Sequence, residues 1–537
     1  MVEIYDTTLR DGAQSKDIYF SLQDKLRIAL KLDEFGIQYI EGGWPGSNPK
    51  DQEFFKAVKQ YSFKHSVITA FGSTRRKDLP PDKDHNLQAI LESGVEVATI
   101  FGKAWALHVT KVLKTSLEQN LDMVYSSITY LREHGLKVIF DAEHFFDGYK
   151  ANPEYALSVL RVAEEAGAQV LVLCDTNGGT LPHEIYKVVK MIKDKVKVLL
   201  GIHCHNDCGM AVANSIQAVL AGAVHVQGTI NGFGERCGNA DLCQIIPTLE
   251  LKLGISTSQL GVERLRRLRE LSQYVYELAG IHPNSYQPFV GDNAFAHKGG
   301  VHVDAVLKVP QAYEHIDPFL VGNQRVFSVS ELSGKANILA KAREFHLPLS
   351  SEDREVLNSI VRKVKELENQ GYHLENADAT LFLLMAKEMG LYREFFKVIY
   401  CRMTSESRDG EFIADSAVKL KIGDQYVYDI AEGNGPVHAE DLALRKALSV
   451  FFPEIKDVEL VNYRVSIADV AAGTASAVRV FIEFSDGERS WRTVGVSTNI
   501  LEASKVALID GYDYYLQLKR NPKLRGITAS RKGSAGS

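Results

Sequence analysis

The sequence predicts an α/β protein: a (β/α)8 TIM barrel followed by helical subdomains and a C-terminal α+β domain with an internal repeat. Short apolar runs alternate eight times with longer helical patterns between residues 1 and 253, which matches the size and order of such a barrel. Amphipathic helical patterns then take over. After residue 396, strand-like segments recur as two similar copies.

The eight expected strands are short runs rich in β-branched and aromatic residues. They are VEIYDTT, YIEGG, SVITAFG, VEVATIFG, KVIFDAE, VLVLCDT, KVLLGIH and HVQGTIN. Polar side chains lie at, or just after, the carboxyl ends of most of these strands, where barrel enzymes carry their catalytic groups. The positions concerned are Asp11, Glu41, Glu143, Thr176, His203, His205 and Asn239.

The rest of the chain divides by pattern into three parts. Helical linker subdomains are expected over 254–395, where GVERLRRLRELSQYVYEL and SEDREVLNSIVRKVKELENQ are amphipathic. A further domain is expected over 396–520, because SAVKLKI at 416–422 recurs as SAVRVFI at 476–482. The last residues, 521–537, are predicted to form a disordered tail.

One glycine-rich run, EGNGPVHA, could be mistaken for a phosphate-binding loop. It lacks the Lys and Ser/Thr of a P-loop, so we predict a turn that leads into a helix.

The composition excludes several classes of protein. With 45% hydrophobic and 24% charged residues, the 537-residue chain has an ordinary globular composition and is too long for one core. The net charge of −6 argues against a nucleic-acid partner, and no apolar run approaches the ~18 to 20 residues that span a membrane. Six irregularly spaced cysteines fit reduced thiols. We therefore expect a cytoplasmic protein.

Three polar runs predict a metal site. Asp11, His203, His205 and Asn239 together offer a carboxylate, two imidazoles and an amide oxygen, a set that suits Mg²⁺, Mn²⁺ or Zn²⁺. Residues two apart in a strand point the same way, so both histidines can face one ion. An HxH pattern alone more often marks two structural histidines. A cysteine-containing zinc site is a second alternative, but Cys204 alternates with the histidines and should face away from them.

Four motifs and the C-terminal repeat occur together in this order: DTTLRDG, HCHND, GERCGN and GGVHVDA. With these motifs, nearly the whole chain resembles the metal-dependent, acyl-CoA-condensing TIM-barrel enzymes that include 2-isopropylmalate, homocitrate and citramalate synthases. The stretches YIEGGWPGSNPKD and FDAEHFFDGYK resemble the citramalate branch more specifically.

The resemblance implies an acyltransferase that joins acetyl-CoA to pyruvate in a Claisen condensation, giving (R)-citramalate and CoA for isoleucine biosynthesis. The nearest alternatives are 2-isopropylmalate or homocitrate synthase, which would use larger keto acids. A metal-dependent acyl-CoA lyase and a non-catalytic amino-acid sensor are alternatives of other classes. Phe101, Lys103 and Asp141 are candidates for shaping the keto-acid pocket.

The resemblance also implies roles for the polar residues at the strand ends. Arg10 is placed to bond the keto oxygen as it becomes an alkoxide, and its alternative role is a salt bridge to a barrel carboxylate. Thr176 resembles the threonine that holds the substrate carboxylate, and its alternative role is a cap for the helix near Pro182.

A Claisen condensation needs a base for the methyl group of acetyl-CoA. Glu143 is the best carboxylate candidate. His302 and Tyr313 match the family's catalytic His and Tyr, which reach over a barrel, often that of the neighbouring subunit. The sequence leaves open whether Glu143 acts directly or His302 and Tyr313 activate a water molecule.

The C-terminal repeat resembles the regulatory domain of the leucine branch of this family. The resemblance implies a homodimer and an end-product effector, for which isoleucine is expected. A dimerisation domain without an effector is the alternative.

Overall fold

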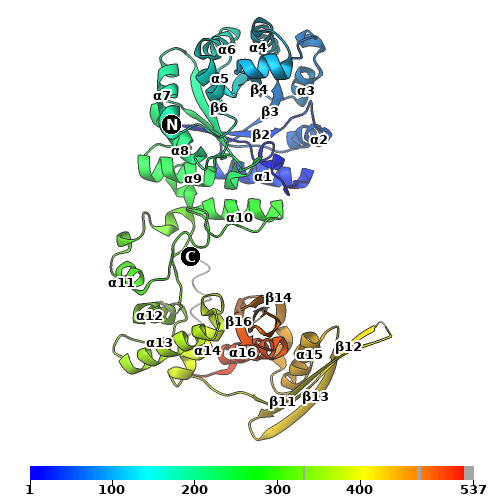
Figure 1. Ribbon diagram of the computed structural model, residues 1–537, viewed down its shortest axis with the longest axis vertical. Helices are drawn as coiled ribbons and strands as arrows, with labels where there is room; N and C mark the ends of the chain where they lie inside the picture. Colours follow the sequence, from blue (N-terminus) through cyan, green and yellow to red (C-terminus); the bar gives the residue numbers. More distant parts are fainter. Residues whose placement is uncertain (331–332, 410, 469–472, 525–537) are drawn as a thin grey trace. The chain divides into compact units, whose positions relative to one another are not determined.

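The computed structural model describes residues 1–330, 333–409, 411–468 and 473–524. The chain divides into two compact units, which are described separately. The barrel unit comprises Met1–Phe295 and Ile316–Arg325, and the C-terminal unit comprises Ala296–His315 and Val326–Ser537. Figure 1 labels most of the helices and many of the strands of each unit.

In the barrel unit, eight parallel strands form a closed barrel in sequence order, because β1 pairs with both β2 and β8. This closed order confirms the predicted fold class. Neighbouring strands bring Lys103 beside Glu143 and His203 beside Gln227. The strands are β1 (Glu3–Asp6), β2 (Tyr39–Gly43), β3 (Val67–Ser73), β4 (Val97–Lys103), β5 (Lys137–Glu143), β6 (Val170–Asp175), β7 (Leu199–Cys204) and β8 (His225–Gly228).

Helices surround the strands of the barrel (Figure 1). The first helix shows why they begin and end where they do: Ser21 and Asp24 form a capping box, and Gly36 ends the helix in a left-handed conformation. The helices are α1 (Leu22–Phe35), α2 (Pro49–Ala57), α3 (His85–Ser93), α4 (Leu117–Glu133), α5 (Phe145–Ala151), α6 (Pro153–Ala166), α7 (Pro182–Lys193), α8 (Ala211–Ala221), α9 (Leu242–Pro247) and α10 (Leu268–Ala279).

The C-terminal unit begins with helices and two short paired strands. These are β9 (Ala296–His297), α11 (Gly300–Lys308), β10 (Val326–Phe327), α12 (Lys335–Glu344), α13 (Arg354–Asn369) and α14 (Asp378–Glu388). Helix α13 has the amphipathic pattern predicted from the sequence: Leu357, Ile360 and Val364 are buried on one face.

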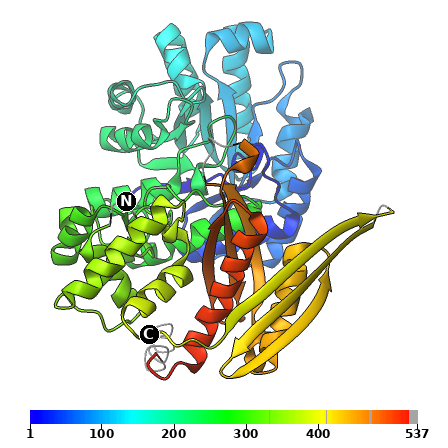
Figure 2. The ribbon, with the colours of Figure 1, turned by 60° about the horizontal axis from the view of Figure 1, so that its bottom comes forward.

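Two βββα modules follow, which confirms the internal repeat. Each has a three-stranded antiparallel sheet and one helix, and Figure 2 shows α15 and α16 beside the sheets of their own modules. Segment 416–422 lies in β12 and residues 478–482 of the second segment lie in β15, the middle strands of the two sheets. The elements are β11 (Lys397–Arg408), β12 (Glu411–Ile422), β13 (Gln425–Gly433) and α15 (Pro436–Ser449), then β14 (Glu459–Ile467), β15 (Val478–Ser485), β16 (Ser490–Ser497) and α16 (Ile500–Arg520).

The run EGNGPVHA is a strand end, a turn and a helix start, as predicted. Helix α15 begins at Pro436, directly after Gly435, and proline suits the first helical position because its missing N–H would have no intrahelical partner there.

The predicted disordered tail, 521–537, falls outside the described residues from 525 onward. The segment boundaries at 253, 395 and 520 stay predictions. Within the described part of the chain, no helix is long and apolar enough to cross a membrane.

Candidate metal centre and active site

Three buried side chains meet at the carboxyl end of the barrel. Asp11 follows β1, His203 lies in β7, and His205 comes just after β7. Nε2 of His203 is 3.4 Å from Oδ2 of Asp11, and Nε2 of His205 is 3.9 Å from the same oxygen. Within the described residues, this is the one group of His, Cys, Asp or Glu side chains with three potential metal-ligand atoms close together. The cluster contains no cysteine, so the arrangement favours the carboxylate and imidazole set.

Asn239, the fourth predicted ligand, lies beside this cluster. A backbone bridge joins it to His205, and its Nδ2 donates to Oδ2 of Asp11 at 2.8 Å. Oδ1 of Asn239 and Nδ1 of His205 are buried and have no hydrogen-bond partner among the described residues. Unpaired buried polar atoms are costly, and a cation would satisfy the amide oxygen.

The loop that carries Asn239 requires glycine at position 234. A Cβ atom there would lie 1.9 Å from Oδ1 of Asn239, and the φ angle of Gly234 is +159°. A larger residue would therefore displace the amide from the cluster.

The electrostatics of the cluster produce the protonation states that a metal site needs. Burial alone would raise the pKa of Asp11, but Arg10 and the two histidines lower it to about 2. Burial and the neighbouring His203 lower the pKa of His205 to about 4, and burial lowers the pKa of His203. An anionic carboxylate thus faces two neutral imidazoles. The triad is consistent with a divalent metal site.

Arg10 is fixed between two carboxylates. Its Nε donates to Oε2 of Glu41 at 2.7 Å, and Nη1 is 3.4 Å from Oδ1 of Asp11. The guanidinium carbon lies 3.6 Å from the ring centre of Phe71. Burial would lower the pKa of Arg10, but Asp11 and Glu41 raise it. The salt bridge considered as an alternative role is therefore present, and it orients the guanidinium toward the cluster.

Glu41 is the centre of a polar network inside the barrel. Besides Arg10, it accepts hydrogen bonds from Tyr5, at 2.8 Å, and from Thr7. Tyr5 also contacts the hydroxyls of Thr69 and Thr99, at 2.9 and 2.8 Å. The sequence analysis identified Glu41 but missed Tyr5. Tyr5 lies within the first predicted strand, and a buried Tyr hydroxyl needs a hydrogen-bond partner. That requirement could have identified Tyr5 from the sequence.

Glu143 and Thr176 lie at neighbouring strand ends. Nζ of Lys103 forms an ion pair with Oε2 of half-buried Glu143. Oγ1 of Thr176 accepts a 2.9 Å hydrogen bond from the backbone N–H of His144, which has a left-handed φ of +57°. Helix α7 has Leu181 at its N-cap, so Thr176 does not serve as a cap.

Arg236 is a residue that the sequence analysis did not single out. Its guanidinium donates to both carboxylate oxygens of Asp207, at 2.7 and 2.9 Å, and to the carbonyl oxygen of Thr176 at 2.7 Å. It therefore ties together the loops after β6, β7 and β8. Arg236 and Asp207 both lie inside the motifs GERCGN and HCHND, which was the available signal.

His302 and Tyr313 belong to the C-terminal unit. Their rings stack with centroids 4.1 Å apart, and both side chains are exposed. His297 is instead buried, and its Nε2 lies 3.1 Å from Oε1 of Glu314. The structure thus brings the two predicted catalytic rings together, and their roles stay predictions.

Three family models match successive parts of the chain. The HMGL-like model matches residues 1–273, the homocitrate synthase post-HMGL domain-like model matches 289–372, and the LeuA allosteric (dimerisation) domain model matches 375–516.

Relatives of similar length match nearly the whole chain. The (R)-citramalate synthase of Sulfolobus acidocaldarius is 54% identical over 97% of this chain and 97% of its own. The enzyme of the same name from Geobacter sulfurreducens is 52% identical over 96% of this chain and 98% of its own. A 2-isopropylmalate synthase from Methanocaldococcus jannaschii is 31% identical, over 96% and 95%. The chain therefore belongs to the HMGL-like barrel enzymes and, among them, to the (R)-citramalate synthase family.

Proposed function

We propose that the protein condenses acetyl-CoA with pyruvate and water to give (R)-citramalate and CoA, a step toward isoleucine. The observation that carries this proposal is the 54% identity, over nearly the full length, to a relative named for that product. The named 2-isopropylmalate synthase is much less similar, at 31%.

The free state of the six cysteines in the described residues supports a cytoplasmic location.

The proposed site holds one divalent cation, Mg²⁺, Mn²⁺ or Zn²⁺. Asp11, His203 and His205 would be ligands, with the amide oxygen of Asn239 as the fourth. A bound cation would supply Lewis-acid polarisation of the keto group of pyruvate.

Two residues of the barrel would hold the acceptor. Arg10 donates from a position fixed by Glu41, so its remaining N–H groups are available to the oxygen that becomes an alkoxide. Thr176 would bond the pyruvate carboxylate through its hydroxyl proton, because the hydroxyl oxygen already accepts from the N–H of His144.

Glu143 is the proposed base that takes a proton from the methyl group of acetyl-CoA. It is half-buried at the end of β5 and is held by Lys103. In the alternative mechanism, a water molecule activated by the stacked pair His302 and Tyr313 takes this proton instead.

The first experiment measures CoA release by metal-supplemented protein with acetyl-CoA and each of four acceptors: pyruvate, 2-oxobutanoate, 2-oxoisovalerate and 2-oxoglutarate. Preference for pyruvate is expected. Preference for 2-oxoisovalerate or 2-oxoglutarate would favour isopropylmalate or homocitrate synthesis instead. The absence of CoA release with all four acceptors would favour the lyase or sensor alternatives.

We also propose that the active protein is a homodimer with a composite site. The match to a dimerisation domain supports this, as does an exposed apolar stripe on β13 made of Tyr426, Tyr428 and Ile430. Chains carrying Asp11→Ala and chains carrying His302→Ala should each be inactive as homodimers. A mixed dimer contains one chain of each variant. If the neighbouring subunit supplies His302, one of its two sites combines an intact Asp11 with an intact His302, so the mixed dimer should regain activity. A mixed dimer that stays inactive would contradict the composite site.

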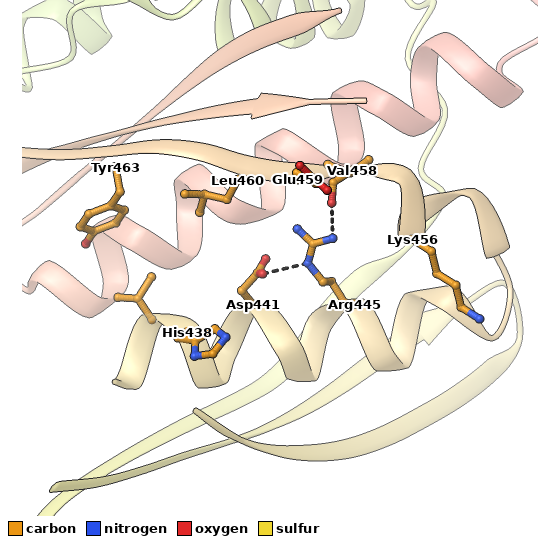
Figure 3. Close-up of a pocket in the computed structure, with 9 residues that line it drawn as sticks. His438, Asp441, Arg445, Lys456, Val458, Glu459, Leu460 and Tyr463 are labelled. Atoms are coloured by element: carbon orange, nitrogen blue, oxygen red, sulfur yellow. Dashed lines mark hydrogen bonds and ion pairs between the residues drawn. The ribbon is translucent and has the colours of Figure 1, made fainter. Parts of the chain in front are cut away.

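The C-terminal unit has a cavity that suits an amino-acid effector. It has a volume of about 650 Å³ and lies between α15 and β14. Figure 3 shows Arg445 reaching across it, bonded to Asp441 and to the carbonyl of Val458. Val437 and Leu460 add apolar surface, and Lys456 adds a second cation. We propose that isoleucine binds here, its carboxylate near the cations and its side chain against the apolar residues.

Calorimetry with isoleucine, leucine and valine tests this proposal. Isoleucine should bind most tightly, and Leu460→Ala or Arg445→Met should weaken its binding at least tenfold. Lys446→Met is the matched control, since this exposed cation lies on α15 outside the cavity-lining residues. Unchanged binding in the cavity variants would contradict the site. No binding of any of the three amino acids would favour a dimerisation domain without an effector.

A further inference from the structure

A buried chain of three polar side chains runs behind one metal-ligand candidate. Nδ1 of His203 lies 2.9 Å from Oε1 of Gln227. Nε2 of Gln227 donates to Oδ1 of Asp141 at 3.0 Å. All three side chains are buried: the exposed fractions are 6% for His203, 1% for Gln227 and 4% for Asp141. The chain begins at β7, passes through β8 and ends at β5.

The order of donors and acceptors in this chain determines the tautomer of His203. The amide of Gln227 has one donor end and one acceptor end. Since a carboxyl oxygen of Asp141 accepts from the NH₂ group, the carbonyl oxygen must face His203. A carbonyl oxygen can only accept, so Nδ1 of His203 carries the proton. Nε2 is then left with its lone pair, on the side that faces Asp11 at 3.4 Å.

We propose that Gln227, oriented by Asp141, is a positioning residue that holds His203 in the tautomer required for metal binding. This inference rests on the metal site proposed above. Histidine ligands are usually oriented by a hydrogen bond to the second ring nitrogen, commonly from a carboxylate or a backbone carbonyl. Here a side-chain amide takes that place, and a carboxyl group sets the direction of the amide.

The geometry gives Asp141 a role other than shaping the keto-acid pocket. Its Oδ1 is occupied by Gln227, and the side chain is nearly inaccessible. Without Asp141, either end of the Gln227 amide could face His203. Rotation of the amide would present its NH₂ group to Nδ1 and favour the wrong tautomer. The burial of this carboxyl group is therefore explained by the direction that it imposes.

The test measures the dissociation constant of Mn²⁺ from the metal-stripped, full-length protein by electron paramagnetic resonance of free Mn²⁺. Gln227→Met keeps the side-chain volume but removes the acceptor, and it should raise the Mn²⁺ dissociation constant about 10- to 100-fold. The double variant Gln227→Glu/Asp141→Asn exchanges the amide and the carboxyl along the same chain. It keeps an acceptor toward His203, so its dissociation constant should stay within about threefold of the wild type.

A matched control separates metal binding from folding. Gln38 makes hydrogen bonds to the backbone of Ile4, Gly36 and Thr257, and it lies just before β2, at the opposite end of the barrel. Gln38→Met should lower the melting temperature of the metal-free protein without changing the Mn²⁺ dissociation constant. If circular dichroism shows that Gln227→Met is unfolded, the Mn²⁺ dissociation constant of the double variant tests the proposal instead. Weak binding by a folded double variant would overturn the proposal.

Two further outcomes distinguish a failure of the role of Gln227 from a failure of the metal site. Mn²⁺ binding that is lost in Asp11→Ala but unchanged in folded Gln227→Met would overturn the role of Gln227 and leave the metal site standing. Mn²⁺ binding that survives Asp11→Ala would overturn the metal site itself, and the proposal for Gln227 with it.

Discussion

The barrel unit and the C-terminal unit both bury carboxyl groups, but they surround them differently. In the barrel, Asp11 faces the Arg10 guanidinium and two imidazoles, and its pKa falls to about 2 in spite of burial. In the C-terminal unit, burial raises the pKa of Glu440 to about 7. Oε1 of Glu440 accepts from the Cys401 thiol at 3.3 Å, and Oε2 has no hydrogen-bond partner in the described part of the chain.

The difference shows how the surroundings of a buried acid indicate its purpose. A buried carboxylate that a neighbouring guanidinium keeps charged, and that faces two neutral imidazoles, is prepared for an incoming positive ion. A buried carboxyl whose pKa is raised by burial, in spite of a thiol donor, offers no such site, and its charge state instead links the stability of its domain to pH.

The largest effect is expected from the barrel carboxylate. Asp11→Ala should lower kcat by more than the 10- to 100-fold that is typical of residues behind a metal ligand, because it removes a ligand itself. Steady-state CoA release with pyruvate measures the loss, and circular dichroism checks the fold. Full wild-type activity after thorough chelation would contradict the metal dependence that this prediction assumes.

Arg10→Lys should produce the next largest effect. Lysine keeps the charge but cannot bond Glu41 and face Asp11 through a planar fork. Loss of one fixed donor to a developing oxyanion typically lowers kcat about 10²- to 10³-fold. A fall in kcat with little change in the KM for pyruvate is expected. An increase in KM alone would indicate that Arg10 only binds the substrate.

In the C-terminal unit, Glu440→Gln should change stability rather than catalysis. The folded-state pKa of about 7 exceeds the ordinary value of 4.5, so between these pH values the folded state binds more protons than the unfolded state. The stabilisation from protonated Glu440 is complete below pH 4.5 and is lost as pH rises through 7. The total loss is about 3 kcal/mol, since each pKa unit corresponds to about 1.4 kcal/mol.

Urea denaturation at pH 5 and pH 8 measures this effect. Trp44→Phe and Trp105→Phe leave Trp491 as the single tryptophan, so its fluorescence reports the C-terminal unit. Glu440→Gln should stabilise the protein at pH 8 and flatten the pH dependence. Glu366→Gln, at an exposed position in α13, is the control and should leave the slope unchanged. An equal effect from both variants would show that burial is not the cause.

The sequence predicted the barrel and the cluster of Asp11, His203 and His205 because both follow local rules. Strand ends meet at one end of a parallel barrel, and residues two apart share a face. The contacts of these residues could not be predicted in the same way. The pairs Lys103 with Glu143 and Gln227 with Asp141 depend on strand register and on inward direction across the barrel, which no local pattern encodes.

The same limit applies to the C-terminal unit. The repeat was visible because its two copies resemble each other. The partnership of Cys401 with Glu440 joins the first strand of a module to its helix across 39 positions, and the similarity of the two copies does not indicate it. Its consequence for pH dependence follows only from burial, and burial depends on the packing of the whole module.

The smallest effect is expected from an exposed carboxylate, which separates charge from burial. Asp304 and Lys308 form an i,i+4 pair on α11, 2.7 Å apart, with 55% and 71% of their side chains exposed. Asp304→Asn should cost no more than about 0.5 kcal/mol, because water already solvates both groups. The cost should vanish in 1 M salt, where the screening length is about 3 Å. Urea denaturation with the Trp491 reporter measures both values. A loss as large as the effect of Glu440→Gln would show that the charge itself, rather than its removal from water, sets the difference between the two acids.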